Sequence, residues 1–279
     1  MRRPGLAPRG FVLGAMLTLA PAASAAWWGE VETGILHDTN LSRSTEDQAE
    51  DGLLWLTAGV GQMIALGRDG ALTWRGTAAA DLPADVAALR RFAPGLSLSY
   101  RHKLRLGQDA PFVAAGILAR YDDYESELRE GWTLGASLRA GRRWPAVLLE
   151  GEIGWEQRRA EADPFDQQAW TGAVRADWSL PWFALHGGYE ARLGDVTSTA
   201  FPDPEILAAS TARTADPAFG AGRVSYRLDA SAHAVEVGLR RDLPHRTAVD
   251  LTYRFERTFA DADLTYDDQR LSGSFRVRF

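Results

Sequence analysis

The last nine residues constrain the fold of this chain more than any other segment. Leucine, glycine, phenylalanine, valine and phenylalanine occupy every second position of 271–279, and two serines followed by Arg276 and Arg278 fill the positions between them. A β-strand sends alternate side chains to opposite faces. The segment therefore predicts a strand with one apolar face and one polar, cationic face, and the aromatic residue Phe279 ends it.

The same alternation recurs along the whole chain. Segments with a period of two fall at residues 28–38, 52–66, 70–81, 90–106, 111–123, 130–143, 146–159, 167–180, 183–195, 231–243, 246–258 and 266–279. Most exceed the ~5–6 residues of an ordinary strand and reach the ~9–11 residues that a tilted transmembrane strand needs. Tight turns that contain glycine, proline or aspartate alternate with longer polar links. The tight turns are at 67–70, 107–110, 144–145, 181–182 and 244–245.

These features predict an all-β fold: a transmembrane antiparallel up-and-down β-barrel with short periplasmic turns and longer extracellular loops. Twelve strands fit the pattern, and ten to fourteen strands are the alternatives. Tryptophans and tyrosines near the strand ends are expected to form two aromatic girdles. The periplasmic girdle would hold Trp28, Trp74, Trp144 and Trp182, and the outer girdle Tyr124, Trp132, Trp155, Trp170 and Tyr266.

Residues 196–230 interrupt the regular pattern. Asp203 and Pro204 are typical of an N-cap and a first helical residue, so we expect a short helix over 205–213. The apolar positions are even in 224–228 but odd in 235–239. Either a bulge lies near 229–232, or 222–229 form a separate strand. We favour the first, with the tenth strand extended above the membrane.

The N-terminal residues predict export. Arginines, a short apolar run and an Ala-x-Ala site stand in the order of a signal peptide, so we expect 1–25 to be cleaved and 26–279 to form the barrel domain. The absence of cysteine excludes a disulfide framework and a thiolate metal site. The net charge of −6 excludes a generally basic chain, so no nucleic-acid partner is expected.

The face opposite the apolar positions carries many charges, and lipid exposure would cost ~2–4 kcal/mol for each Arg or Lys at the bilayer midplane. We therefore expect these residues to face the lumen. The proposed lumen-lining residues are Arg101, Lys103, Arg105, Arg139, Arg143, Arg175, Arg192, Arg240, Arg254, Glu150, Glu152, Glu190 and Glu236. Either they line a water-filled path that selects anions, or they pair across strands and fill the interior.

No motif predicts an enzyme, a cofactor or a metal site, and no catalytic residue is assigned. His186 and Glu190 share a face near Arg192, either as an acid–base group or, as we favour, as a hydrogen-bond network. The expected outer loops are acidic, either for solubility or because their carboxylates share divalent cations with lipopolysaccharide.

The chain as a whole resembles a single-chain bacterial outer-membrane β-barrel protein. This resemblance implies a location in the cell outer membrane and contact with membrane lipid and lipopolysaccharide. It also implies that Phe275, Val277 and Phe279 form the signal that the barrel-assembly machinery reads. Residues 32–41, ETGILHDTNL, resemble the first strand and loop of porin-like barrels and of surface-lipoprotein-assembly-modifier-type barrels, although His37 stands where tyrosine is more usual.

The sequence thus leaves two functions open. The first is a porin-like narrow channel for small hydrophilic, anionic solutes. The alternative is a non-channel structural or accessory barrel that serves export or surface assembly.

Overall fold

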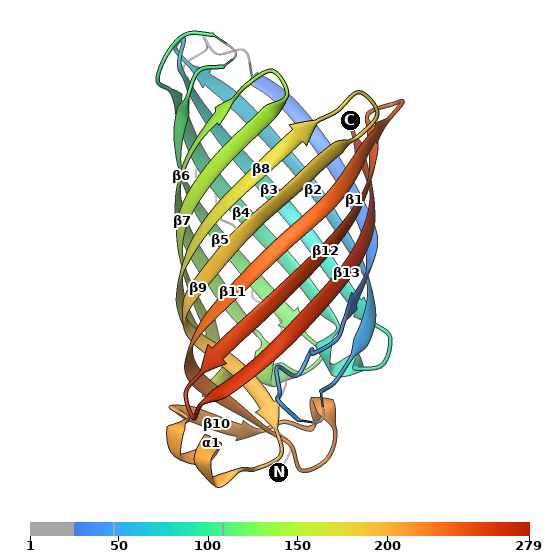
Figure 1. Ribbon diagram of the computed structural model, residues 1–279, viewed down its shortest axis with the longest axis vertical. Helices are drawn as coiled ribbons and strands as arrows, with labels where there is room; N and C mark the ends of the chain where they lie inside the picture. The colour runs from blue at the N-terminus through green and yellow to red at the C-terminus, as the bar shows by residue number, and fades with distance from the viewer. Residues whose placement is uncertain (1–24, 47, 108) are drawn as a thin grey trace, which may run out of the picture.

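The computed structural model describes residues 25–46, 48–107 and 109–279. Within these residues, twelve long antiparallel strands form one closed barrel (Figure 1). The strands are β1 (Ala25–Asp38), β2 (Asp51–Leu66), β3 (Gly70–Pro83), β4 (Arg91–Lys103), β5 (Phe112–Tyr124), β6 (Gly131–Arg143), β7 (Val147–Ala160), β8 (Gln167–Ser179), β9 (Ala184–Ala200), β11 (Val224–Leu243), β12 (Thr247–Ala260) and β13 (Leu264–Arg278). The predicted fold class and strand positions are confirmed, whereas the predicted signal peptide lies, except for Ala25, outside the described residues.

The first and last strands close the barrel. β1 pairs with β13 in a register that runs from Glu30 opposite Arg278 to Asp38 opposite Arg270. At its end, Gly29 N donates to Phe279 O at 2.8 Å and Phe279 N donates to Gly29 O at 3.0 Å. We call this pairing the closing seam. It confirms that the terminal strand, which the sequence singles out, closes onto the first.

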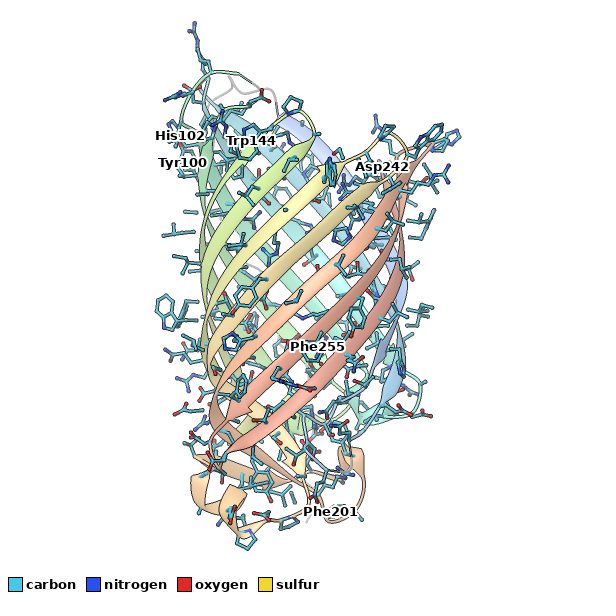
Figure 2. All side chains as sticks on the ribbon, in the orientation of Figure 1. Tyr100, His102, Trp144, Phe201, Asp242 and Phe255 are labelled. Carbon is cyan, nitrogen blue, oxygen red and sulfur yellow. The ribbon has the colours of Figure 1, made fainter. Side chains whose placement is uncertain are left out.

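The outer face of the barrel is apolar. Leu96, Ile117, Leu138 and Ile153 are 58–65% exposed at alternate positions of four neighbouring strands. Figure 2 shows such side chains projecting all round the wall, with Trp144 near one end and Phe201 at the other. Monomeric soluble proteins rarely expose apolar patches of this extent, whereas a transmembrane barrel presents such a band to lipid.

Part of the predicted aromatic girdle is wrong. Alternation in β1 places Trp27 outside and Trp28 inside, where the Arg75 guanidinium lies 5.4 Å from the Trp28 ring. Tyr124 lines an internal cavity, and Tyr266 is only 3% exposed. Depth along the strand places these aromatic residues near the membrane surface, but their odd or even position decides which face of the wall they occupy.

The two ends of the barrel differ. The end that holds the hairpin turns 67–69, 144–146 and 244–246, here called the short-turn end, also carries the C-terminus (Figure 1). The opposite, long-loop end carries α1 (Pro204–Ala209), β10 (Ala212–Ala215) and four one-turn 3₁₀ helices. These are η1 (Ala87–Leu89), η2 (Glu127–Arg129), η3 (Asp163–Phe165) and η4 (Pro217–Phe219). Among the described residues, no helix is long and apolar enough to cross a membrane.

The irregular segment resolves into extensions of two strands. β11 pairs with β9 from Val224 to Arg240 without a break, so there is neither a bulge nor a separate strand in 222–232. The apolar parity changes because Tyr226 and Leu228 point into a small hydrophobic cluster at the long-loop end, with Val196, Ile206 and Tyr266. The inner face is therefore apolar in this extension and polar within the barrel.

The short helix begins as expected. The Asp203 carboxylate accepts hydrogen bonds from Glu205 N at 2.8 Å and Ile206 N at 3.3 Å, and Pro204 occupies the first turn. The helix ends at Ala209, earlier than predicted, because residues 212–215 form β10 and pair with β11.

Candidate functional site

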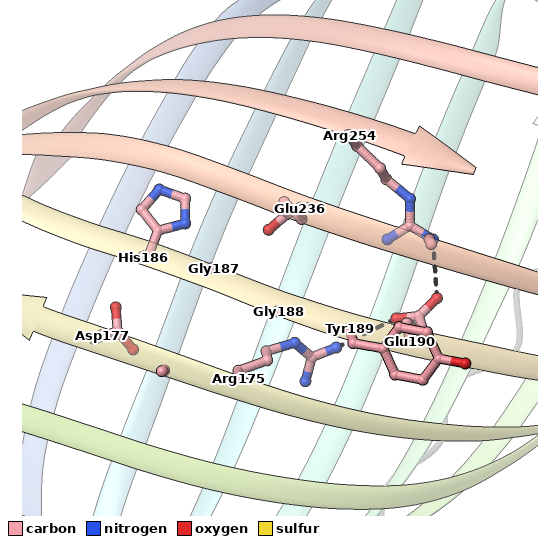
Figure 3. Close-up of a pocket in the computed structure, with 11 residues that line it drawn as sticks. Arg175, Asp177, His186, Gly187, Gly188, Tyr189, Glu190, Glu236 and Arg254 are labelled. Atoms are coloured by element: carbon pink, nitrogen blue, oxygen red, sulfur yellow. Dashed lines mark hydrogen bonds and ion pairs between the residues drawn. The ribbon is translucent and has the colours of Figure 1, made fainter.

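A chain of ion pairs follows the inner wall of the barrel from β6 to β12. Glu152 on β7 contacts Arg139 of β6 at 3.4 Å and Arg175 of β8 at 2.9 Å. Arg175 also contacts Glu190 of β9 at 3.4 Å, and Glu190 contacts Arg254 of β12 at 3.0 Å (Figure 3). We call these five residues the central belt. The structure thus brings five of the sequence-predicted residues together, in the paired arrangement that was one of the two interpretations.

The central belt fixes side-chain positions more than it stabilises the barrel. Its side chains remain 21–48% exposed, so water screens their attraction. Exposed ion pairs contribute only ~0.2–1 kcal/mol each. The main effect of these ion pairs is to hold the charged side chains of the central belt against the wall. Part of the cross-section of the barrel therefore stays open.

The open part lies along β4–β8, where small side chains face inward. A cavity of about 610 Å³ is bounded there by the wall and by the central belt. Its small lining residues are Ser97, Ser99, Gly116, Gly135, Ser137, Gly154 and Thr171. Because serine, glycine and threonine occupy little volume, one side of the interior stays empty beside the longer, charged side chains of the central belt.

The short-turn end holds cations that, among the described residues, have no carboxylate within ion-pair distance; the charge of Glu150 acts on Arg101 only from farther away. Arg101 stacks on the Phe112 ring at 3.8 Å, and Lys103 and Arg143 end their strands. In the described part of the chain, none of these three forms an ion pair. Arg240 has only loose contacts, at 3.9 Å to Asp177 and at 3.8 Å to a second aspartate on its own strand.

Other predicted residues at this end take different positions. Arg105 lies in the turn that follows β4, and it is exposed. Arg276 and Arg278, whose parity suggested a cationic face, are each 3.0 Å from a glutamate of β1. They belong to the closing seam, because Glu30 and Glu32 lie opposite them in register.

Three predicted residues remain. Glu236 lines a small cavity beside the central belt (Figure 3), and Glu150 lies opposite Arg175 in the hairpin register. Arg192 donates to Gln167 Oε1 at 3.3 Å and to the carbonyl oxygen of Asp195 at 2.6 Å. Among the described residues, Arg192 forms no ion pair.

The suspected acid–base group does not assemble. Nε2 of His186 lies 3.0 Å from Oδ2 of Asp250, whose other oxygen accepts a hydrogen bond from the Thr252 hydroxyl at 2.6 Å. The imidazole and the hydroxyl thus share the Asp250 carboxylate as their hydrogen-bond partner. Glu190 pairs with arginines instead, which supports the hydrogen-bond-network interpretation.

A loop that sequence reasoning treated as external folds into the barrel mouth. In residues 39–50, the Asn40 side chain donates to Ser44 O at 3.0 Å and to Asp267 O of β13 at 3.0 Å, and accepts from Ser44 N at 3.0 Å. Thr199 N of β9 donates to Ser42 O at 2.9 Å. Asp38, Asn40, Ser42 and Ser44 are each at most 2% exposed. Their alternation with other residues is the sequence pattern that indicates a loop with one buried, polar side.

Other loops close over this one. We call residues 39–46, 48–50, 125–130, 161–166 and 201–223 together the long-loop lid. Its centre is a buried, bidentate ion pair between Arg129 and Asp216, with the guanidinium 4.4 Å from the Phe165 ring and 5.6 Å from the Phe219 ring. Burial alone would raise the pKa of Asp216. Hydrogen bonds and charge from Arg129, and a hydrogen bond from Ser225, hold this pKa below its ordinary value.

The described residues contain no group of three or more His, Asp or Glu side chains that could hold a metal ion. The idea that loop carboxylates share divalent cations with lipopolysaccharide therefore stays a prediction.

Comparisons with known proteins agree with this architecture. No protein-family model matches the sequence, and a search of curated proteins finds no match. An outer-membrane channel from Pseudomonas putida F1 superposes with a TM-score of 0.56 at 10% identity, over 97% of this chain and 100% of that one. The channel DcaP of Acinetobacter baumannii gives 0.47 at 9% identity, over 92% and 97% of the two chains. The first likeness establishes a shared β-barrel fold.

Proposed function

We propose that this protein is a channel of the bacterial outer membrane, with a narrow lumen that passes small hydrophilic anions. In this proposal the long-loop end is extracellular, and lipid and lipopolysaccharide surround the apolar wall. The exposed side chains of Phe275 and Phe279, with Val277 between them, present the closing strand to the barrel-assembly machinery. The protein then has no catalytic role.

One observation carries the anion preference. Most charges inside the barrel are paired, but Arg101, Lys103 and Arg143 at the short-turn end are not, and the cavity of about 610 Å³ lies along the strands that carry them. Unpaired cations at a low-dielectric mouth attract counter-ions and raise their local concentration. Anions are therefore favoured over cations along this wall.

Single-channel recording in a planar bilayer tests the proposal. In a salt gradient, the reversal potential should show anion selectivity. Replacing Arg101, Lys103 and Arg143 together by serine should shift it toward cation selectivity, because the mouth loses three unpaired positive charges. The matched control replaces Arg68 and Arg241, which lie at the same end outside the interior, and should leave the reversal potential unchanged. Cation selectivity of the unmodified protein would refute the anion preference.

The long-loop lid favours a second function, an accessory barrel without conduction. The lid is anchored through Ile206 to the hydrophobic cluster on β9, β11 and β13 and contains a buried ion pair, which suits a surface that binds another molecule at the cell exterior. A protein that is folded by heat-modifiability on a gel but electrically silent would support this role. If shortening 201–223 then produced conductance, the lid would be a closure of a channel and the accessory role would fail.

A further inference from the structure

We propose that Arg43 and Arg158 form a binding site for a small oxyanion, carboxylate or phosphate, at the junction between the long-loop lid and the lumen. This inference rests on the proposed channel function and names the solute chemistry that the channel holds. It adds a specific site at the opposite end of the barrel from the unpaired cations.

The first argument is the way the loop presents Arg43. This residue has a φ of 52°, a left-handed conformation that is uncommon for any residue except glycine. Such a conformation persists only where the surroundings over-determine it. Here Arg43 N donates to Asn40 O at 3.0 Å, Arg43 O accepts from the Ser198 hydroxyl at 2.6 Å, and the Asn40 side chain holds Ser44 on both sides. The loop is therefore a rigid support for one arginine.

The second argument is where the side chain lies. Arg43 lines a cavity of about 440 Å³ beneath the lid, and it also lines a smaller cavity of about 150 Å³ next to the central belt. A solute that moved from one cavity to the other would pass this guanidinium. Glu256 lines the smaller cavity too; its ion pair is with Arg254 at 3.0 Å, and the charge of Arg43 acts on it only from beyond ion-pair distance.

The third argument is which cations are available. Five arginines line the larger cavity, and three of them already pair with carboxylates: Arg91 with Asp81 and Asp122, Arg129 with Asp216, and Arg270 with Asp38 and Asp268. Within the described residues, Arg43 and Arg158 form no ion pair. Nε of Arg158 is buried and has no hydrogen-bond partner, although its Nη2 donates to the carbonyl oxygen of Arg129.

These features define the ligand. Guanidinium groups present planar pairs of donors that match carboxylate and phosphate oxygens, and a buried donor without a partner is costly until a ligand fills it. A volume of about 440 Å³ falls within the range of small-molecule sites. The site therefore suits a compact organic acid or a phosphate, and a neutral molecule of the same length would leave both guanidinium groups unpaired.

Isothermal titration of the full-length, detergent-solubilised protein tests the site independently of conduction. The probes are succinate and inorganic phosphate, with butane-1,4-diol as the neutral analogue of succinate. We expect saturable one-site binding of at least one anion and none of the diol. Arg43→Gln and Arg158→Gln should each weaken binding about tenfold or more, because each removes a charge-assisted hydrogen-bonding group. Arg68→Gln, which removes the same charge from an exposed short-turn residue, should bind like the unmodified protein.

The outcomes separate the site from the channel. Absence of saturable anion binding, unchanged affinity in both variants, or an equal loss in Arg68→Gln would overturn the site. If Arg43→Gln does not fold, as judged by heat-modifiability, Arg158→Gln decides alone. A protein that binds succinate but gives no conductance refutes the channel and leaves the site. A protein that conducts but does not bind refutes the site alone.

Discussion

The closing seam permits a quantitative test of what joins the first and last strands. On its inner face, Arg276 donates from Nε to Oε2 of Glu32 at 3.0 Å and from Nη2 to Oε1 at 3.1 Å. Ser274 Oγ donates to the same carboxylate at 2.9 Å. The two charged side chains are only 27% and 17% exposed, so the wall shields them from much of the water.

The expected magnitude follows from this geometry. Exposed ion pairs contribute ~0.2–1 kcal/mol, whereas hydrogen bonds to charged groups contribute ~1.5–3 kcal/mol. The Arg276–Glu32 ion pair is bidentate, and the barrel wall shields it partly from water, but one side remains in contact with water. We therefore expect a coupling free energy of about 1.5 kcal/mol between Arg276 and Glu32.

A double-mutant cycle measures this coupling. Arg276→Gln, Glu32→Gln and the double variant are unfolded with guanidinium from lipid vesicles, and the folded fraction is read by heat-modifiability. A second cycle on Arg90 and Glu125 is the control, because this pair is 3.5 Å apart and its side chains are 52% and 55% exposed. The control should couple by less than about 0.5 kcal/mol. Equal coupling in the two cycles would refute the claim that shielding by the wall strengthens the seam.

The lid and the interior provide further tests. Because the folded-state pKa of Asp216 lies below its ordinary 3.8, its stabilising contact with Arg129 is complete above that pH and is lost as pH falls through the lowered pKa. The protection factors of the amides in 201–223, which correct for the intrinsic exchange rate at each pH, should be equal at about pH 7 and pH 5 and should fall below about pH 4; lower protection at pH 5 than at pH 7 would contradict this. Tyr226→Ala removes a fully buried ring, costs ~3 kcal/mol locally, and should open the lid to protease while the barrel stays heat-modifiable. Gly238→Ala would place a methyl group 2.2 Å from the His186 ring and 2.8 Å from the Thr252 hydroxyl, and it should destabilise the barrel by ~1–3 kcal/mol. His186→Ala in the same chain should restore part of this stability, and no recovery would refute the clash with the imidazole.

Alternation was enough to predict the barrel, its strand positions and the partner of the terminal strand, because a period of two fixes which face each side chain occupies. The same rule contained the correct placement of Tyr124, which has the parity of the inward residues Arg120 and Asp122. A prediction from depth along the strand alone puts Tyr124 in the outer girdle, because it ignores this parity. Pairing within one hairpin was also within reach, since Arg139 and Glu152 are direct cross-strand neighbours.

The rest depends on curvature and closure. Arg254 reaches Glu190 at 3.0 Å across the intervening strand β11, so this contact joins strands that are not direct neighbours. The loop 39–50 lies inside because Asn40 and Ser42 find partners on β13 and β9, which are more than 150 residues away. A local pattern cannot reveal such contacts, because each partner lies on a strand that is placed only by the whole barrel.

These distant partners of the loop imply an order of folding. Asn40 needs Asp267 of the last strand, and Ser42 needs Thr199 of β9, so the loop cannot adopt its inward form on an open sheet. Loop-closure entropy makes contacts of this sequence separation form late. Slow exchange of the amides in 41–44 would therefore report that the sheet has closed. A barrel stalled before closure would have its paired strands but would lack the loop conformation that positions Arg43 for anion binding.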